Sequence, residues 1–280
     1  MRSLAIRRTQ DRGSIMFGND AVSIYDRCPS PKFEQVLKFI RYRSPRAGKL
    51  FDVGCGTGSL IALLNQRGWR CAGCDPSAAM VRAARTKNPT AAISNASASN
   101  FQVESPVDLV TCTFDVVNHF PSLRVVSTFF RRARAALRPS GLLIFDTVTP
   151  ADINVNWIGY IEVDRVGDTY MVRTGRRTGD GRGTLTYEIF RRVRGDNWRK
   201  SVEVHTLRAL DREWMLASLR ASGFVNIQVV DAMTLGRATP RTVRWLIAAR
   251  VPNAAASGSA TNRVRPSENG STRRLAVQAT

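Results

Sequence analysis

A glycine-rich stretch early in the chain constrains the fold more than any other feature of the sequence. Residues 50–58 read LFDVGCGTG, which places three glycines within five positions directly after a short apolar run. Glycine lets the backbone approach a ligand closely and adopt φ angles that are closed to other residues. A strand that leads through such glycines into a helix is how open α/β sheets hold a ligand at their carboxyl edge. The stretch therefore predicts an α/β fold with a ligand site after its first strand.

The spacing of these glycines argues against two common kinds of nucleotide site. No lysine follows them, so they do not form the GxxxxGK[ST] loop that holds a triphosphate. The pattern GxGxG also differs from the GxGxxG of dinucleotide-binding folds. We therefore expect neither a triphosphate nor a nicotinamide cofactor.

Alternating strand and helix patterns run through most of the chain. Strands are predicted at 49–53, 69–74, 91–94, 107–114, 141–147, 224–230 and 243–249. Helices are predicted at 21–43, at 59–66, from Ser77 onward, from Ser122 to a stop at Pro139, and at 212–221. This rhythm favours right-handed crossovers between parallel strands. It predicts a Rossmann-like seven-stranded, mostly parallel sheet with helices on both faces.

The rhythm changes between the fifth strand and the last helix. Segments there alternate in polarity or carry β-branched and aromatic residues, with DG and GD turns between them: 157–164, 169–173, 184–192 and 198–207. They predict an antiparallel excursion. The chain then divides into a flexible basic arm at 1–20, a core at 21–150, a substrate-covering insertion at 151–207, the completion of the core sheet at 208–251, and a disordered polar tail at 252–280.

Cysteine and apolar content exclude several classes of protein. Cys71 and Cys74 form a CxxC, but no second CxxC or HxxxH accompanies it, so we predict no metal site. Reduced cysteines and the lack of a secretory signal favour a cytoplasmic protein. No apolar run approaches about 18 residues, so no membrane span is expected.

The charge is the most unusual feature of the composition. The 280 residues carry a formal net charge of +20. Such a charge suits a polyanionic partner such as nucleic acid, or reflects arginines spread over a solvated surface. The sequence leaves both readings open, and it does not indicate an oligomeric state.

An acidic residue ends the second predicted strand. Asp75 closes the run WRCAGCD, at the tip of the strand that follows the glycine stretch. A carboxylate at that place can accept hydrogen bonds from both hydroxyls of a ribose. The alternative role for Asp75 is the N-cap of the helix that begins near Ser77.

These motifs together resemble the class I S-adenosylmethionine-dependent methyltransferases. The matching stretches are FDVGCGTG, CDPS, DLVTCTFDVVNHF and RRARAALRPSGLLIFD, and the likeness runs from about residue 25 to about residue 251. The resemblance implies S-adenosylmethionine as cofactor. It places Asp52, Gly54 and Gly56 around the methionine moiety and assigns Asp75 to the ribose.

The resemblance also implies contacts from three further segments. Relatives often place an acid and an apolar residue after the third strand to hold the adenine, and here Ser97 and Ala98 stand at those positions. Phe114 follows the fourth strand beside the cofactor. Tyr25 would line the pocket from an N-terminal helix, unless it is only a core aromatic of that helix.

Two polar residues after the fourth strand are candidates for catalysis. His119 is one of two histidines, and an ordinary imidazole can accept a proton near neutral pH. It resembles a histidine considered near the acceptor in relatives that act on amino sugars. Asp115 could hold an amine or a water. Both residues have structural alternatives, as a packed histidine and as a solvated turn acid.

The insertion carries a second candidate pair. Glu203 and His205 lie two residues apart on a predicted strand, so their side chains share one face. They would contact the substrate or form a surface pair. We predict methyl transfer to an amine or hydroxyl of a small molecule. The alternatives are an RNA or DNA methyltransferase, suggested by the charge, and a noncatalytic cofactor-binding protein.

Overall fold

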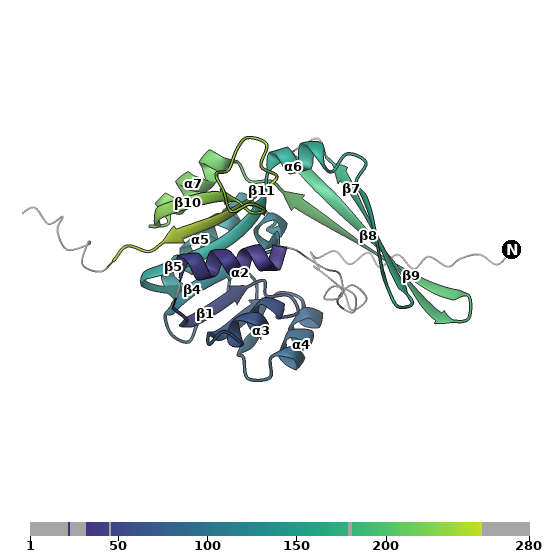
Figure 1. Cartoon of the computed structure of the whole chain (residues 1–280), viewed down its shortest axis with the longest axis horizontal. Coiled ribbons are helices and arrows are strands. Elements are labelled where there is room, and N and C mark those ends of the chain that lie inside the picture. Colours follow the sequence, from purple (N-terminus) through teal and green to yellow (C-terminus); the bar gives the residue numbers. More distant parts are fainter. Residues whose placement is uncertain (1–21, 23–31, 45, 179–180, 254–280) are drawn as a thin grey trace, which may run out of the picture.

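The computed structural model describes residues 22, 32–44, 46–178 and 181–253, and shows two β-sheets flanked by helices. A central sheet with helices on both faces forms the larger part, and a long antiparallel sheet extends from one side of it (Figure 1). The predicted arm at 1–20, residues 21 and 23–31 of the predicted first helix with Tyr25 among them, and residues 254–280 of the predicted tail lie outside the described residues.

The central sheet has seven strands in the order β10-β11-β5-β4-β1-β2-β3. Its strands are β1 (Lys49–Val53), β2 (Arg70–Asp75), β3 (Ile93–Asn95), β4 (Val107–Cys112), β5 (Leu137–Val148), β10 (Val225–Asp231) and β11 (Arg244–Arg250). The first five strands of the chain all run parallel to their neighbours among themselves, and β11 runs antiparallel to both β5 and β10. The predicted mostly parallel, seven-stranded sheet is confirmed.

Strand alternation divides the core into two apolar clusters, one on each face of the sheet. Leu50, Leu109 and Ile144 pack with one group of helices, whereas the next residues along each strand pack with the other group. The first group comprises α2 (Lys32–Arg43), α3 (Ser59–Asn65) and α4 (Ala78–Lys87), and the second comprises α5 (Leu123–Ala136) and α7 (Arg212–Ala221). Burial on both faces explains why these strands read as continuous apolar runs.

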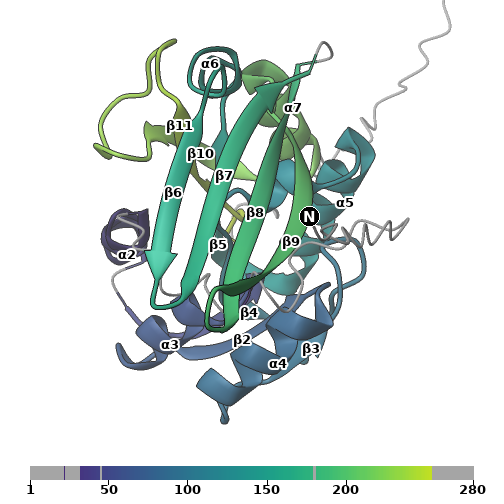
Figure 2. The ribbon, with the colours of Figure 1, turned by 90° about the vertical axis from the view of Figure 1, so that its right-hand side faces the viewer.

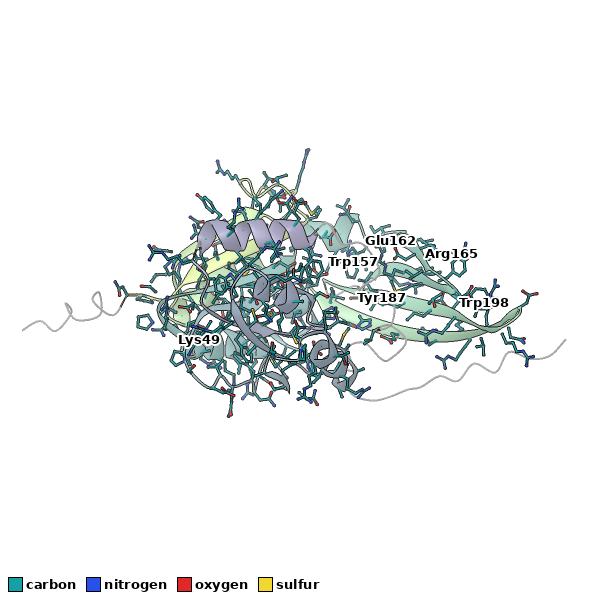
Figure 3. All side chains as sticks on the ribbon, turned by 60° about the horizontal axis from the view of Figure 1, so that its bottom comes forward. Lys49, Trp157, Glu162, Arg165, Tyr187 and Trp198 are labelled. Carbon is teal, nitrogen blue, oxygen red and sulfur yellow. The ribbon has the colours of Figure 1, made fainter. Side chains whose placement is uncertain are left out.

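The predicted antiparallel excursion is a four-stranded sheet in the order β6-β7-β8-β9. Its strands are β6 (Ile161–Val166), β7 (Thr169–Arg177), β8 (Arg182–Arg194) and β9 (Asn197–Arg208). Viewed from its own side, this sheet lies in front of the central sheet (Figure 2). Figure 3 shows Trp157 and Tyr187 nearer the core, and Arg165 and Trp198 toward the free end of the sheet.

Several element boundaries differ from the predicted ones. β4 ends at Cys112, before Phe114, because Phe114 and Asp115 both take positive φ angles that end the extended backbone. The helix before Pro139 ends at Ala136, since a residue that precedes proline avoids the helical region. The sequence analysis missed α6 (Pro150–Val155), whose N-cap Thr149 accepts a hydrogen bond from the Asp152 amide. It also missed the single 3-10 turn η1 (Val116–His119).

Among the described residues, none of the helices has the length and apolar character needed to cross a membrane.

Candidate functional site

The glycine loop after β1 combines one tightly enclosed glycine with one that borders open space. Gly54 has a φ of 73°, and a Cβ there would lie 2.4 Å from Val116 Cγ1. Gly56 has a φ of 54°, and the nearest atom to its Cβ position is Met80 Sδ at 4.0 Å. Gly54 is therefore required for close contact with η1, whereas, apart from its chain neighbours, no described residue comes closer than Met80 to the Cβ position of Gly56.

A buried amide anchors the far end of this loop. Asn88, at the C-terminus of α4, donates from Nδ2 to the Gly58 carbonyl at 3.0 Å and to the Ala84 carbonyl at 3.1 Å. Lys87 Nζ donates to Ser59 Oγ at 2.6 Å. These contacts hold the start of α3 against α4, so they fix the C-terminal end of the glycine loop.

Asp75 links the glycine loop to the turn after β2. Its Oδ2 accepts a hydrogen bond from the Gly56 amide at 3.0 Å, and its Oδ1 accepts one from the Ser77 amide at 2.8 Å. Ser77, not Asp75, is the N-cap of α4, since its hydroxyl accepts from the Met80 amide at 3.3 Å. Burial raises the pKa of Asp75, and the two amide bonds partly offset that rise. An ionised carboxylate has about four acceptor positions, so two remain for a ligand.

Asp52 is a second buried acid at the same edge of the sheet. Its side chain is almost fully buried and accepts a hydrogen bond from Thr111 Oγ1 at 2.7 Å. Burial raises the pKa of Asp52 to about 7; the Thr111 bond opposes the rise and the charge of Asp75 adds to it. Two buried acids whose ionisation is disfavoured would be stabilised as anions by a cationic ligand.

The segment after β3 is held by contacts within itself. The Ser97 amide donates to Asn100 Oδ1 at 2.7 Å, and the Ser97 hydroxyl donates to the same oxygen at 2.9 Å. Ala98 is buried in the apolar cluster that contains Phe101. The Ser97 hydroxyl therefore stabilises a local turn, and the side chain of Ala98 contributes to the core.

The turn after β4 has a strained backbone. Phe114 and Asp115 have φ angles of 68° and 67°, a conformation that bulky residues rarely adopt and that costs on the order of 1–3 kcal/mol each. The Asp115 amide donates to Asp146 Oδ1 at 3.2 Å, and Arg244 Nη1 donates to carboxylate oxygens of both Asp115 and Asp146. The ring of Phe114 lies against that of Phe33, with centroids 4.2 Å apart. The half-buried Asp115 thus forms an ion triad with the buried Asp146 and Arg244.

The buried Asn118 side chain joins η1 to both sheets. Its Nδ2 donates to Thr147 Oγ1 at 2.8 Å and to the Arg208 carbonyl at 2.7 Å, and its Oδ1 accepts from the Val148 amide at 3.0 Å. The contacts tie η1 to the end of β5 and to the end of β9. They position the next residue, His119, at the junction of the two sheets.

Both histidines of the chain meet at this junction. The rings of His119 and His205 lie edge to face with centroids 5.6 Å apart, and the ring of Tyr187 lies 4.9 Å from that of His205. His205 Nε2 lies 3.4 Å from Glu203 Oε2, so the predicted pair does share one face. Burial, and to a lesser extent His205, lowers the pKa of His119 to about 3, which keeps its imidazole neutral near pH 7.

The cysteines of the CxxC lie in the core. Cys71 and Cys74 are buried, and burial raises the pKa of each thiol to about 12, which disfavours the reactive thiolate. Within the part of the chain that the structure describes, no three His, Cys, Asp or Glu side chains gather as they would to hold a metal ion.

Sequence reasoning missed several polar residues of this region, among them Thr111, Asp146 and Arg244. Thr111 has no signal in the sequence beyond a polar residue in an apolar strand. Arg244 is separated from Asp115 by 129 positions, so only the pairing of β11 with β5 brings it to the turn. The available signal for Arg244 was its charge at the start of an otherwise apolar strand.

Comparisons with known proteins agree with this geometry. Residues 50–141 match the family described as "Methyltransferase domain". The chain is similar to the dTDP-3-amino-3,6-dideoxy-alpha-D-glucopyranose N,N-dimethyltransferase of Streptomyces fradiae, with 28% identity over 148 residues, 52% of this chain and 57% of that protein. It is similar to the dTDP-4-amino-2,3,4,6-tetradeoxy-D-glucose N,N-dimethyltransferase of Saccharopolyspora spinosa, with 25% identity over 48% of this chain and 56% of that protein. The chain thus spans somewhat more than half the length of these curated relatives.

Solved structures share the fold over a longer stretch. The sugar N-methyltransferase KedS8 from a Streptoalloteichus species superposes with a TM-score of 0.70 at 22% identity, covering 90% of this chain and 100% of that one. The S-adenosylmethionine-bound CalS10, an amino pentose methyltransferase from Micromonospora echinaspora, gives a TM-score of 0.66 at 23% identity over 86% and 99% of the two chains. The family match places a methyltransferase domain at residues 50–141, and the strand order together with these structures shows that the chain has the fold of the class I S-adenosylmethionine-dependent methyltransferases.

Proposed function

We propose that this protein transfers a methyl group from S-adenosylmethionine to an amine of a small molecule, with an amino sugar as the acceptor class. The main observation in support is that the glycine loop and the His119–His205 junction both flank the turn after β4. A cofactor cradle and a polar cluster that includes residues of the insertion therefore adjoin at one edge of the sheet.

The residues around the glycine loop fit the cofactor. The open space at Gly56 leaves room for a ligand against the main chain. Asp75 keeps acceptor positions for ribose hydroxyls. The raised pKa values of Asp52 and Asp75 suit the positive charges of the methionine ammonium and the sulfonium. Tyr25, Ser97, Ala98 and Phe114 remain predicted contacts.

The bound cofactor supplies an electrophilic methyl group, so the protein must align the acceptor and exclude water. An amine reacts only through its free lone pair, and an ammonium must first lose a proton. Within this junction the neutral imidazole of His119 can accept a hydrogen bond from the amine, whereas its pKa of about 3 makes it a weak base for removing a proton from an ammonium. Glu203, which lies beside His205, can attract the ammonium form of the acceptor to the site.

The identity of the acceptor rests on the relatives. Two of them are named as N,N-dimethyltransferases of dTDP-linked amino sugars. At 28% and 25% identity these names suggest a class of acceptor and no particular sugar. A hydroxyl acceptor would need the same proton removal, so it remains the secondary prediction.

Methylation of a metabolite panel tests the proposal. Purified protein is incubated with S-adenosylmethionine and matched pairs of dTDP-sugars that differ only by an amino or a hydroxyl group, and products are followed by mass spectrometry. We expect methylation of amino sugars, at a lower rate in His119→Asn. Methylation of only the hydroxyl members would refute the amine assignment.

The net charge of +20 motivates a second candidate, a methyltransferase acting on RNA or DNA. Methylation confined to tRNA or rRNA, with steeply salt-dependent binding, would favour it. The third possibility, a noncatalytic protein, predicts S-adenosylhomocysteine binding with no methylated product in either panel.

A further inference from the structure

Arg244 reaches the cofactor side of the site from the last strand of the sheet. Its side chain is 9% exposed, and its Nη1 donates to the carboxylates of both Asp115 and Asp146. Asp146 in turn accepts from the Asp115 amide through its other oxygen at 3.2 Å. The side chain and the backbone of Asp115 are therefore both held by the same ion pair.

The ion pair of Arg244 and Asp146 stabilises a turn whose backbone would otherwise relax. Phe114 and Asp115 are consecutive non-glycine residues with φ angles of 68° and 67°. Residues in this region persist only where the surroundings determine them strongly. Arg244 and Asp146 are the charged groups that bond directly to Asp115, and they come from neighbouring strands of a fully paired part of the sheet.

The conformation of the turn shapes the glycine loop. Val116 follows Asp115 and fills the space beside Gly54, where even a methyl group would lie 2.4 Å from Val116 Cγ1. The ring of Phe114 meanwhile packs at a tilt against that of Phe33 in α2. If Asp115 relaxed to negative φ, Val116 and Phe114 would both be redirected, and the glycine loop would lose one wall.

We propose that Arg244 is a positioning residue for cofactor binding, which holds the Phe114–Asp115 turn in its left-handed conformation against the glycine loop. The inference rests on the proposed function and adds a residue that contacts neither the cofactor nor the acceptor in that proposal. It also assigns the Asp115 carboxylate to the support of the turn.

Calorimetric titration with S-adenosylhomocysteine tests this role through binding, independently of turnover. The variants are Arg244→Met, the double variant Arg244→Met/Asp115→Gly, and the control Arg241→Met, which removes an exposed arginine three residues away. Left-handed backbone costs a non-glycine residue roughly 1–2 kcal/mol, equivalent to about 5- to 30-fold in affinity. We expect a loss of that size in Arg244→Met, recovery in the double variant, and no change in Arg241→Met.

A second pair of variants covers the case in which Arg244→Met does not fold, since it leaves a buried Asp146 without this partner arginine. Asp115→Ala and Asp115→Gly both remove the carboxylate and leave Arg244 with Asp146. Only alanine keeps the backbone strain, so Asp115→Gly should bind at least about fivefold more tightly than Asp115→Ala.

Two results would overturn the role of Arg244 alone. One is a folded Arg244→Met that binds as tightly as the parent protein. The other is equal affinity for Asp115→Ala and Asp115→Gly, which would show that relief of backbone strain has no effect on binding. Failure of the parent protein itself to bind S-adenosylhomocysteine would overturn the proposed function, and the role of Arg244 with it.

Discussion

The ring of His119 meets the ring of His205 edge to face, with centroids 5.6 Å apart, although the two residues belong to different sheets of the fold. His119 is carried by η1 at the edge of the central sheet, and His205 by β9 of the insertion. Asn118, which directly precedes His119, forms hydrogen bonds with residues at the ends of both β5 and β9. These bonds fix the position of His119. The insertion therefore contributes a side chain to the junction that we propose as the acceptor site.

Substitution of His119 should reduce turnover without affecting the cofactor. We expect His119→Asn to lower kcat by about 2- to 10-fold, the effect of losing one neutral hydrogen bond that orients the acceptor, and to leave the Kd for S-adenosylhomocysteine within about twofold of the parent value. Steady-state kinetics with the best acceptor of the panel measure the first quantity, and calorimetry measures the second.

The matched comparison is His205→Asn, because His205 lies behind His119 and beside Glu203. Here we expect mainly a higher KM for the acceptor. Equal loss of cofactor affinity in both variants would contradict a role limited to the acceptor side.

Acid should destabilise the fold through the same histidine. Burial lowers the pKa of His119 from 6.5 to about 3, so the unfolded chain binds a proton between these values while the folded protein does not. The stabilising contribution is present above pH 6.5 and decreases as pH falls toward 3, by at most about 1.4 kcal/mol per pH unit. Urea unfolding at pH 7 and pH 5 should show a smaller loss of stability in His119→Asn than in the parent. An identical pH dependence would mean that His119 titrates normally.

Most helices and strands could be predicted because caps, turns and apolar periodicity depend only on residues that are close in the sequence. The residues from Arg212 to Ala221 form the predicted helix, since Asp211 accepts from the Trp214 amide as its N-cap. The antiparallel sheet follows from alternation and its turns. The sequence also carried a signal for α6, a threonine followed by proline at the N-terminus of a helix, but the short segment has no apolar periodicity to strengthen it.

The candidate site was predictable only where the motif is contiguous. Gly54, Gly56 and Asp75 adjoin because parallel neighbouring strands end at one edge, which the strand pattern already implies. The triad of Asp115, Asp146 and Arg244 depends on strand order and on positive φ angles, neither of which a single sequence displays. The meeting of the two histidines likewise depends on how the insertion folds back.

The two glycines of the loop should respond differently to the same change. Gly54→Ala places a methyl group against Val116 and should cost about 2–5 kcal/mol of folding free energy, the sum of overpacking and left-handed strain. Gly56→Ala meets open space, so only the strain, about 1–2 kcal/mol, is expected. Denaturant unfolding measures both values.

Gly56→Ala, the variant with the smaller expected loss of stability, should nevertheless weaken cofactor binding if the cofactor lies beside Gly56. Folded Gly56→Ala should bind S-adenosylhomocysteine at least about tenfold more weakly than the parent, since its methyl group projects into the ligand space. Unchanged binding by Gly56→Ala would place the cofactor elsewhere.

Loss of the acid that ends β2 should weaken cofactor binding. Hydrogen bonds to a charged group contribute about 1.5–3 kcal/mol, so Asp75→Ala should bind S-adenosylhomocysteine roughly 10- to 150-fold more weakly. The exposed Asp196, in the turn between β8 and β9, provides the control Asp196→Ala, for which no change is expected. Comparable affinities for Asp75→Ala and the parent would remove Asp75 from the site.

Cofactor binding should release protons through Asp52. Burial raises the pKa of Asp52 to about 7 in the ligand-free protein, so its carboxyl group is largely protonated at pH 6. The ammonium of S-adenosylhomocysteine favours the ionised form and lowers this pKa, so binding below pH 7 must expel the proton. The affinity should therefore be independent of pH above about 7.5 and fall by up to about tenfold per pH unit below 7.

Titration in buffers that differ in ionisation enthalpy detects this proton directly. At pH 6 we expect release of close to one proton per bound ligand, and at pH 8 almost none. Asp52→Asn cannot ionise, so it should bind with an affinity that does not vary between pH 6 and pH 8. Thr111→Val serves as the complementary variant: it removes the hydrogen bond that favours ionised Asp52, so it should move the onset of proton release to higher pH. Proton release at pH 6 that persists in Asp52→Asn would mean that another group carries the linkage, and Asp52 would no longer account for the preference for a cationic ligand.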